Sequence, residues 1–138
     1  MSEQGYNGWT NYETWCVNLW IDNDRGWYEQ TRELAIDCYR QASPKVLLDV
    51  VSLSRVDVAV RELESILKEQ VEELNPLADE ASIFSDLLGA ALSEVDWRDI
   101  AEHWINDVAP EIDQEETEET EETDEGDDII AIDDEDAS

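Results

Sequence analysis

Few side chains in this sequence could catalyse a reaction, and the first to consider is its single histidine, His103. It stands one helical turn after Asp99 and next to Trp104. Any Ser-His-Asp or Cys-His triad would have to include it. We interpret His103 as a surface histidine paired with Asp99, and we expect the protein not to be an enzyme.

The two cysteines, Cys16 and Cys38, lack the spacing of a zinc site or a redox pair. Both fall on apolar faces of expected helices. If these helices fold back at residues 23 and 24, the two positions are separated by roughly 10 Å along the helices, which is too far for a disulfide. We expect both thiols to be reduced, and no metal or cofactor to be bound.

A calcium loop is an alternative for the acids between the first two expected helices. Asp22, Asp24 and Glu33 stand at the first, third and twelfth positions of such a loop. The match is partial, because Gly26 is at the fifth place rather than the sixth and Trp27 fits the helical pattern. A pair of carboxylates for glycosidase chemistry also stays open, although no pair stands in apolar surroundings that would raise one pKa.

The composition excludes several classes of protein. The 138 residues include 38 Asp and Glu against 8 Lys and Arg, a formal charge of -30. A chain this acidic is not expected to bind phosphates or an anionic membrane, because it has too few Lys and Arg to neutralise them. It has no apolar run of about 18 residues and no basic leader, so we expect a cytoplasmic protein. With 5 Gly and 3 Pro, a turn-rich β fold is disfavoured.

The spacing of apolar residues predicts an all-α fold, a compact bundle of five or six helices. Thr10 with Glu13, Ser54 with Asp57, and Ser93 with Asp96 have the spacing of helix caps. Ser43 and Pro44 open a short segment that is either a helix or, because it is rich in β-branched residues, a strand. The helices are expected at about 10–21, 27–41, 44–51, 54–74, 82–92 and 93–109, with the last one ending before Pro110.

The core is expected to consist of one apolar stripe from each helix, with four tryptophans supplying much of its area. A platform on which bases stack is the alternative for the tryptophans near the start, but their neighbours are acidic. The expected core residues are Tyr12, Trp15, Cys16, Leu19, Trp20, Trp27, Leu34, Ala35, Cys38, Val56, Val60, Leu63, Leu67, Val71, Leu74, Phe84, Leu87, Leu88, Ala91, Ile100, Ala101, Trp104, Ile105 and Val108.

A boundary is expected after Pro110, because the charge is unevenly divided. Residues 111–138 hold 16 acids and no base, whereas residues 1–110 hold 22 acids and 8 bases. Such a low-complexity, self-repelling segment cannot offset the entropy of ordering. The sequence therefore predicts a helical domain over 1–110 and an acidic tail over 111–138 that is disordered when the protein is alone.

Two blocks of sequence carry a resemblance to a known family. The first runs from Tyr6 through Trp15 and on to Asp24, and the second from Val95 to Ala101. They resemble a family of small uncharacterised proteins of phages, archaeal viruses, plasmids and their hosts. By composition the chain is also similar to phage DNA mimics that block restriction enzymes or CRISPR effectors.

Carboxylates at three- and four-residue spacing on a helix imitate rows of phosphates about 5–6 Å apart. With the resemblance, this pattern predicts a non-enzymatic inhibitor that blocks the DNA or RNA groove of a host defence complex, its partner being a basic nucleic-acid-binding protein. The alternatives are an acidic adaptor that shields a basic partner, and a salt-adapted domain of unrelated role. The expected contact residues are Glu62, Glu69, Glu72, Glu73, Asp96, Asp99, Glu102 and Asp107.

Overall fold

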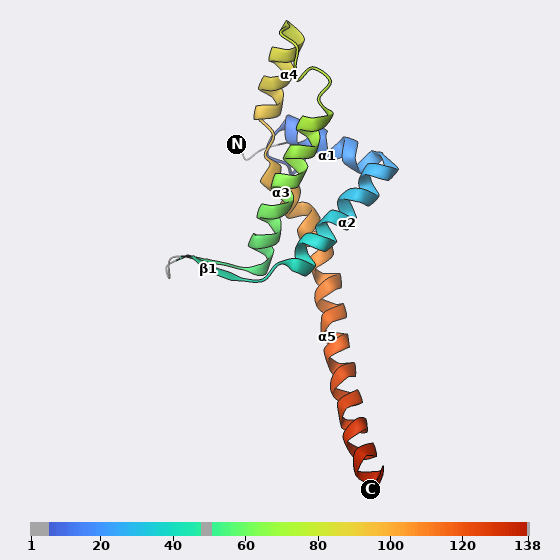
Figure 1. The fold of residues 1–138 in the computed structure, drawn as a ribbon. Coiled ribbons are helices and arrows are strands. Elements are labelled where there is room, and N and C mark those ends of the chain that lie inside the picture. Colours follow the sequence, from blue (N-terminus) through green and yellow to red (C-terminus); the bar gives the residue numbers. More distant parts are fainter. Residues whose placement is uncertain (1–5, 48–50, 138) are drawn as a thin grey trace.

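The structure, a computed structural model, describes residues 6–47 and 51–137, with side chains for 6–45 and 52–119 (Figure 1). The elements, in chain order, are α1 (Tyr12–Asn23), α2 (Arg25–Gln41), β1 (Lys45–Leu47), β2 (Val51–Leu53), α3 (Arg55–Leu74), α4 (Ile83–Ser93) and α5 (Trp97–Ala137). The all-α prediction is confirmed, with five helices and one short hairpin among the described residues.

Polar caps begin these helices, and one of the three expected caps is confirmed. In α3, Ser54 and Asp57 form the full capping box, with both hydrogen bonds at 3.1 Å. The cap of α1 is Asn11 rather than Thr10, and its Oδ1 accepts the Thr14 N–H at 2.9 Å. An asparagine caps as well as a threonine does, so the pattern alone could not separate the two neighbours.

The cap of α5 also differs from the expected one. Asp96 Oδ1 accepts the backbone N–H of Asp99 at 3.1 Å, whereas Ser93 is the last residue of α4. One acid, Asp24, both ends α1 and caps α2 by accepting the Trp27 N–H at 3.0 Å. The two helices therefore join at a single residue and meet in a V (Figure 1) instead of lying fully antiparallel.

The short helix expected after Pro44 is a β-hairpin instead, which is the alternative that its β-branched residues allowed. β1 pairs antiparallel with β2 in the register Lys45↔Leu53, Val46↔Ser52 and Leu47↔Val51. Residues 48–50 of the expected helix lie outside the described residues. The hairpin projects from the bundle at the start of α3 (Figure 1).

The core lies where α2, α3 and the first half of α5 pack together. The α5 stripe is confirmed in full, and the second half of the α2 stripe and the centre of the α3 stripe are buried as expected. Trp97 and Trp104 are the two buried tryptophans, whereas Trp20 is 65% exposed. The confirmed core residues are Ala35, Cys38, Val60, Leu63, Leu67, Ile100, Ala101, Trp104, Ile105 and Val108.

The buried face of α1 is not the expected one. Its apolar stripe is exposed at Tyr12, Leu19 and Trp20 and half-buried at Trp15 and Cys16, while Thr14, Asn18 and Ile21 are buried. The two buried polar side chains have hydrogen-bond partners, because Thr14 Oγ1 accepts the Asp96 N–H and Asn18 Oδ1 accepts the Trp104 indole N–H, both at 2.8 Å. An apolar pattern cannot reveal a face of satisfied polar groups.

The helix α4 is also less buried than its sequence predicts. None of its residues is buried, and Ile83, Phe84 and Leu87 are each more than 60% exposed. Figure 1 shows why: α4 extends past the bundle beside the end of α3, where Leu74 is exposed as well. Its apolar stripe therefore lies on the surface of this chain.

The last helix does not end before Pro110, as predicted, but runs through it to Ala137. A proline inside a helix removes one hydrogen bond and crowds the preceding turn. Here the next turn is held by tertiary contacts, since Ile112 is only 3% exposed. Beyond that point α5 projects from the bundle (Figure 1). The disorder expected of this projecting part stays a prediction.

Across the described ranges, no helix is both long and apolar enough to span a bilayer.

Candidate functional site

A tight turn at the start of the described chain positions the first aromatic residue of the site. Tyr6 and Trp9 exchange two backbone hydrogen bonds of 2.7 Å. Between them, Asn7 and Gly8 have φ angles of 50° and 90°. Both values are left-handed, as a type I′ turn requires, and Asn-Gly is the pair that adopts this conformation most readily.

Trp9, delivered by this turn, stacks on the only histidine. The ring centroids of Trp9 and His103 are 3.9 Å apart, with 25° between the planes. His103 Nδ1 lies 2.9 Å from the backbone oxygen of Asp99 and 3.4 Å from its carboxylate. The predicted pairing of His103 with Asp99 is confirmed, and the stacking on Trp9 adds a contact that the sequence did not indicate.

Hydrogen bonds join the two sequence blocks that carry the family resemblance. The Thr10 hydroxyl donates to Asp96 at 2.8 Å, and the Thr10 N–H donates to Asp99 at 2.9 Å. Asn11 Nδ2 donates to the backbone oxygen of Glu94 at 2.7 Å. We call this set, with the bond from Asp96 to Thr14, the N-terminal latch. It ties the start of α1 to the start of α5.

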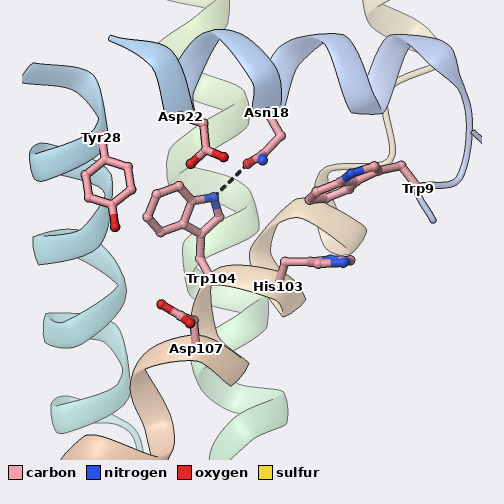
Figure 2. A pocket seen from close by; sticks show the side chains of 7 residues that line it. All are labelled: Trp9, Asn18, Asp22, Tyr28, His103, Trp104 and Asp107. Carbon is pink, nitrogen blue, oxygen red and sulfur yellow. Dashed lines mark hydrogen bonds between the residues drawn. The ribbon is translucent and has the colours of Figure 1, made fainter. Parts of the chain in front are cut away.

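An open pocket of about 260 Å³ lies beside the latch, and we call it the aromatic pocket (Figure 2). Trp104 forms its centre, fixed by the hydrogen bond to Asn18. The ring of Tyr28 meets Trp104 edge-on, with centroids 5.4 Å apart. The lining residues are Trp9, Asn18, Asp22, Tyr28, His103, Trp104 and Asp107.

The sequence patterns did not indicate this pocket as a unit. Asn18 and Asp22 lie one turn apart on α1, and His103 and Asp107 lie one turn apart on α5. Each pair has the four-residue spacing of one helix face, so the signal was present. What the sequence did not contain was the crossing of α1 over α5 that brings the pairs together.

The four α3 acids of the predicted contact set are all exposed. Glu62 lines a hollow beside the hairpin together with Lys45 and Arg61. Glu73 lines a separate hollow between α2 and α3. With Glu69 and Glu72 these acids are free to face a partner, although they do not surround one pocket.

The four α5 acids of that set have different surroundings. Asp96 and Asp99 accept hydrogen bonds in the latch, and Glu102 accepts a 3.0 Å bond from Arg98. Asp107 lines the aromatic pocket. The structure therefore does not bring the eight predicted residues into one row, and their binding role stays a prediction.

Arginines hold the first turns of the acidic segment. Arg55 donates two hydrogen bonds of 2.8 Å to Glu116 and lies 4.1 Å above the ring of Tyr39. The hydrogen bond from Arg55 lowers the pKa of Glu116 and raises that of Arg55 itself. The further contacts, each 2.8 Å long, are Arg32 to Glu111, Arg40 to Glu115, and Tyr39 to Asp113. We call residues 111–116 the anchored segment.

The calcium alternative does not fit the geometry. Helix α2 begins at Arg25, so Asp22 belongs to α1, Asp24 caps α2, and Glu33 lies within α2. No calcium loop separates the helices. Over the residues with described side chains, no group of three or more His, Cys, Asp or Glu residues is placed to hold a metal ion.

Fold and site together define a small acidic all-α protein, in which an N-terminal latch frames an aromatic pocket and arginines anchor an acidic last helix. The chain belongs to the family of unknown function DUF7249, whose model matches residues 2–123. The match includes the latch, the pocket and the anchored segment. Comparisons with curated proteins and with solved structures found no match.

Proposed function

We propose that this protein is a non-enzymatic acidic inhibitor that occupies the nucleic-acid groove of a host defence complex, of CRISPR or restriction type, in place of DNA or RNA. The proposal adopts the context of phages, viruses and plasmids that the sequence resemblance implies, with action in the host cytoplasm. The partner is a basic nucleic-acid-binding protein, and neither nucleic acid nor a membrane is bound directly.

The charge of α5 beyond the anchored segment is the observation that carries this proposal. Residues 117–137 hold 12 acids and no base, in a helix that runs to Ala137. At about 1.5 Å per residue these residues span about 31 Å, so one negative charge falls on roughly every 2.6 Å of axis. Each strand of duplex DNA carries one per about 3.4 Å. The two densities are of the same order.

The mutual repulsion of these acids also supports binding to a cationic groove. Like charges one turn apart destabilise a helix, and the chain has only 8 basic residues. Five of the six arginines form ion pairs among the described side chains. A partner lined with Lys and Arg would relieve the repulsion along the projecting part of α5.

We place the contact surface on the projecting part of α5 and on the exposed α3 acids Glu62, Glu69, Glu72 and Glu73. Asp96 and Asp99 are left out, because their carboxylates already accept hydrogen bonds in the latch. Glu102 is left out because Arg98 neutralises it. Asp107 belongs to the aromatic pocket.

Displacement by duplex DNA tests the proposal. The full chain is immobilised, host extract is passed over it, and captured proteins are eluted either with duplex DNA or with salt. A mimic predicts that DNA releases a nucleic-acid-binding protein, and that changing the 12 acids of residues 117–137 to Gln or Asn abolishes its capture. Retention of the partner in the presence of excess duplex would contradict mimicry.

A matched pair of variants distinguishes a specific role of the α3 acids from a general effect of net charge. One neutralises the four α3 acids, and the other removes the same charge elsewhere, at Glu33, Asp37, Asp79 and Glu80. Weaker capture by the first variant alone supports the α3 surface.

The alternative of a salt-adapted protein has its own test. Such a protein would unfold at low salt and refold in molar salt, which circular dichroism detects.

The exposed apolar stripe of α4 favours a second candidate, an acidic adaptor. Ile83, Phe84 and Leu87 offer a surface that a pure mimic of phosphates does not need. An adaptor would shield a basic partner while that partner still bound DNA. The same displacement experiment distinguishes the two, because an adaptor yields a ternary complex with DNA.

A further inference from the structure

We propose that the aromatic pocket binds the guanidinium group of an arginine side chain presented by the protein partner. This inference rests on the proposed function in one respect, that the partner is basic, and it names the group on that partner which this chain recognises. The pocket lies between α1, α2 and α5 (Figure 2), away from the projecting part of α5. Its ligand can therefore be tested separately.

The charge of the pocket selects a cation. Asp22 and Asp107 lie on opposite sides of the Trp104 ring (Figure 2). No Lys or Arg lines the pocket, and within the described part of the chain neither acid has an ion-pair partner. An anion would be repelled here, and a nucleotide base would bring its phosphate with it. A cation neutralises both carboxylates at once.

The aromatic rings select an organic cation over a metal ion. The hydrogen bond from Trp104 to Asn18 holds the indole in place, and Tyr28 meets that indole at 62°. Trp9, stacked on His103, forms the opposite wall. A cation over the face of such a ring is attracted by the negative charge of its π-system. A hydrated metal ion would instead require several oxygen ligands.

The size and shape of the pocket favour a single arginine side chain. About 260 Å³ is below the roughly 300–1,000 Å³ of pockets that enclose drug-sized ligands, so one side chain fits better than a larger molecule. Guanidinium is planar, stacks on aromatic faces and pairs with two carboxylates, whereas ammonium is compact and strongly hydrated. The flat rings and the flanking carboxylates of the pocket match guanidinium.

Nuclear magnetic resonance on the full-length wild-type protein provides the test. The indole N–H signals of Trp9 and Trp104 are followed during titration with N-acetyl-arginine amide, N-acetyl-lysine amide and N-acetyl-glutamine amide. We expect saturable millimolar binding of the arginine derivative, binding of the lysine derivative weaker by about threefold or more, and no shift with glutamine. Absence of any shift, or equal binding of lysine, overturns the assignment.

A double variant locates the site, and a matched control removes the effect of net charge. D22N with D107N should weaken arginine binding about tenfold, the effect of roughly 1.4 kcal/mol. D79N with E80Q removes the same charge at two exposed positions outside the pocket and should leave affinity within about twofold. Equal losses in both double variants contradict the proposal. If the first variant does not fold, the comparison of arginine with lysine on the wild type still decides.

Two further measurements are needed. The first distinguishes a protein side chain from a free small molecule as the ligand, and the second shows whether this inference holds independently of the proposed function. Free arginine, with charged termini, should bind no better than the capped derivative, and tighter binding of free arginine would identify a small-molecule site instead. The variant with 12 neutralised acids in residues 117–137 should keep its arginine affinity. If duplex DNA fails to displace the partner from the wild-type chain while arginine binding is retained, the mimic proposal is overturned but this one is not.

Discussion

The guanidinium of Arg55 meets the carboxylate of Glu116 through two parallel hydrogen bonds of 2.8 Å. This contact lies six residues beyond Pro110, where the sequence predicts that the helix has ended. Two parallel bonds fix the orientation of both partners. The pair therefore joins the N-terminal end of α3 to the last anchored turn of α5.

Replacing Arg55 with Ala should release the anchored segment without unfolding the bundle. The variant loses the pair with Glu116, the bond from Arg55 Nε to the backbone oxygen of Tyr39, and the stacking on the Tyr39 ring. Amide hydrogen exchange should show lost protection in residues 111–116, whereas the buried turns of α3 stay protected. Unchanged exchange of residues 111–116 would mean that burial of Ile112 and the contacts from Arg32, Arg40 and Tyr39 hold this segment without Arg55.

Acid should weaken the same contact. Because the pKa of Glu116 is lowered in the folded protein from its ordinary value of 4.5, the carboxylate stabilises the contact above that value. The stabilisation is lost as the pH falls through the folded pKa. Chemical shifts of Glu116 followed from pH 7 to pH 3 should give a midpoint below 4.5, and E116Q should remove the transition.

The N-terminal latch should contribute measurably to stability. The variant T10V removes the hydroxyl whose single hydrogen is shared between the carboxylates of Asp96 and Asp99. It should cost about 1–2 kcal/mol, because both acceptors are charged. T117V is a suitable control, since that hydroxyl bonds only to a backbone oxygen one turn back on an exposed surface. Urea unfolding measures both. Equal urea midpoints for the two variants would show that the Thr10 hydroxyl contributes nothing to the free energy of unfolding.

One buried hydroxyl should be dispensable. Thr31 is fully buried, and its Oγ1 has no hydrogen-bond partner among the described residues. The variant T31V replaces an unpaired polar atom with a methyl group and should stabilise the protein by about 1 kcal/mol. Thermal unfolding would show a higher midpoint. Destabilisation of similar size would mean that the hydroxyl has a bonding partner after all.

The two leucines Leu63 and Leu87 should respond very differently to the same substitution. The sequence places both in the core, but Leu63 is fully buried and Leu87 is 61% exposed. L63A should therefore cost about 2–5 kcal/mol, whereas L87A should stay within about 0.5 kcal/mol. Urea unfolding of the two variants measures both costs. A large loss for L87A would indicate that α4 is covered in solution.

The thiol of Cys38 should be inert. Burial raises its pKa to about 11, so almost no thiolate exists at pH 8. Ellman's reagent should react readily with the half-buried Cys16 and reach Cys38 only on unfolding. The raised pKa also predicts that stability is unaffected below about pH 8.5 and declines as the pH approaches 11, because only the unfolded thiol ionises there.

The sequence by itself determined the helices that local chemistry specifies. Ser54 and Asp57 form a capping box wherever a helix follows, and the α5 stripe from Ile100 to Val108 is apolar at helical spacing. Both features depend on residues within one or two turns. The pairing of His103 with Asp99 belongs to the same class, and so does the distribution of charge.

Only the tertiary structure decided which faces are buried and where the last helix stops. Asn18 can be buried because the indole of Trp104, from a helix distant in sequence, supplies its partner. Helix α5 passes Pro110 because Arg32 and Arg55, from α2 and α3, hold the turns beyond it. Burial of a polar group and continuation past a proline are each unfavourable locally, so the compensating contacts had to come from elsewhere in the chain.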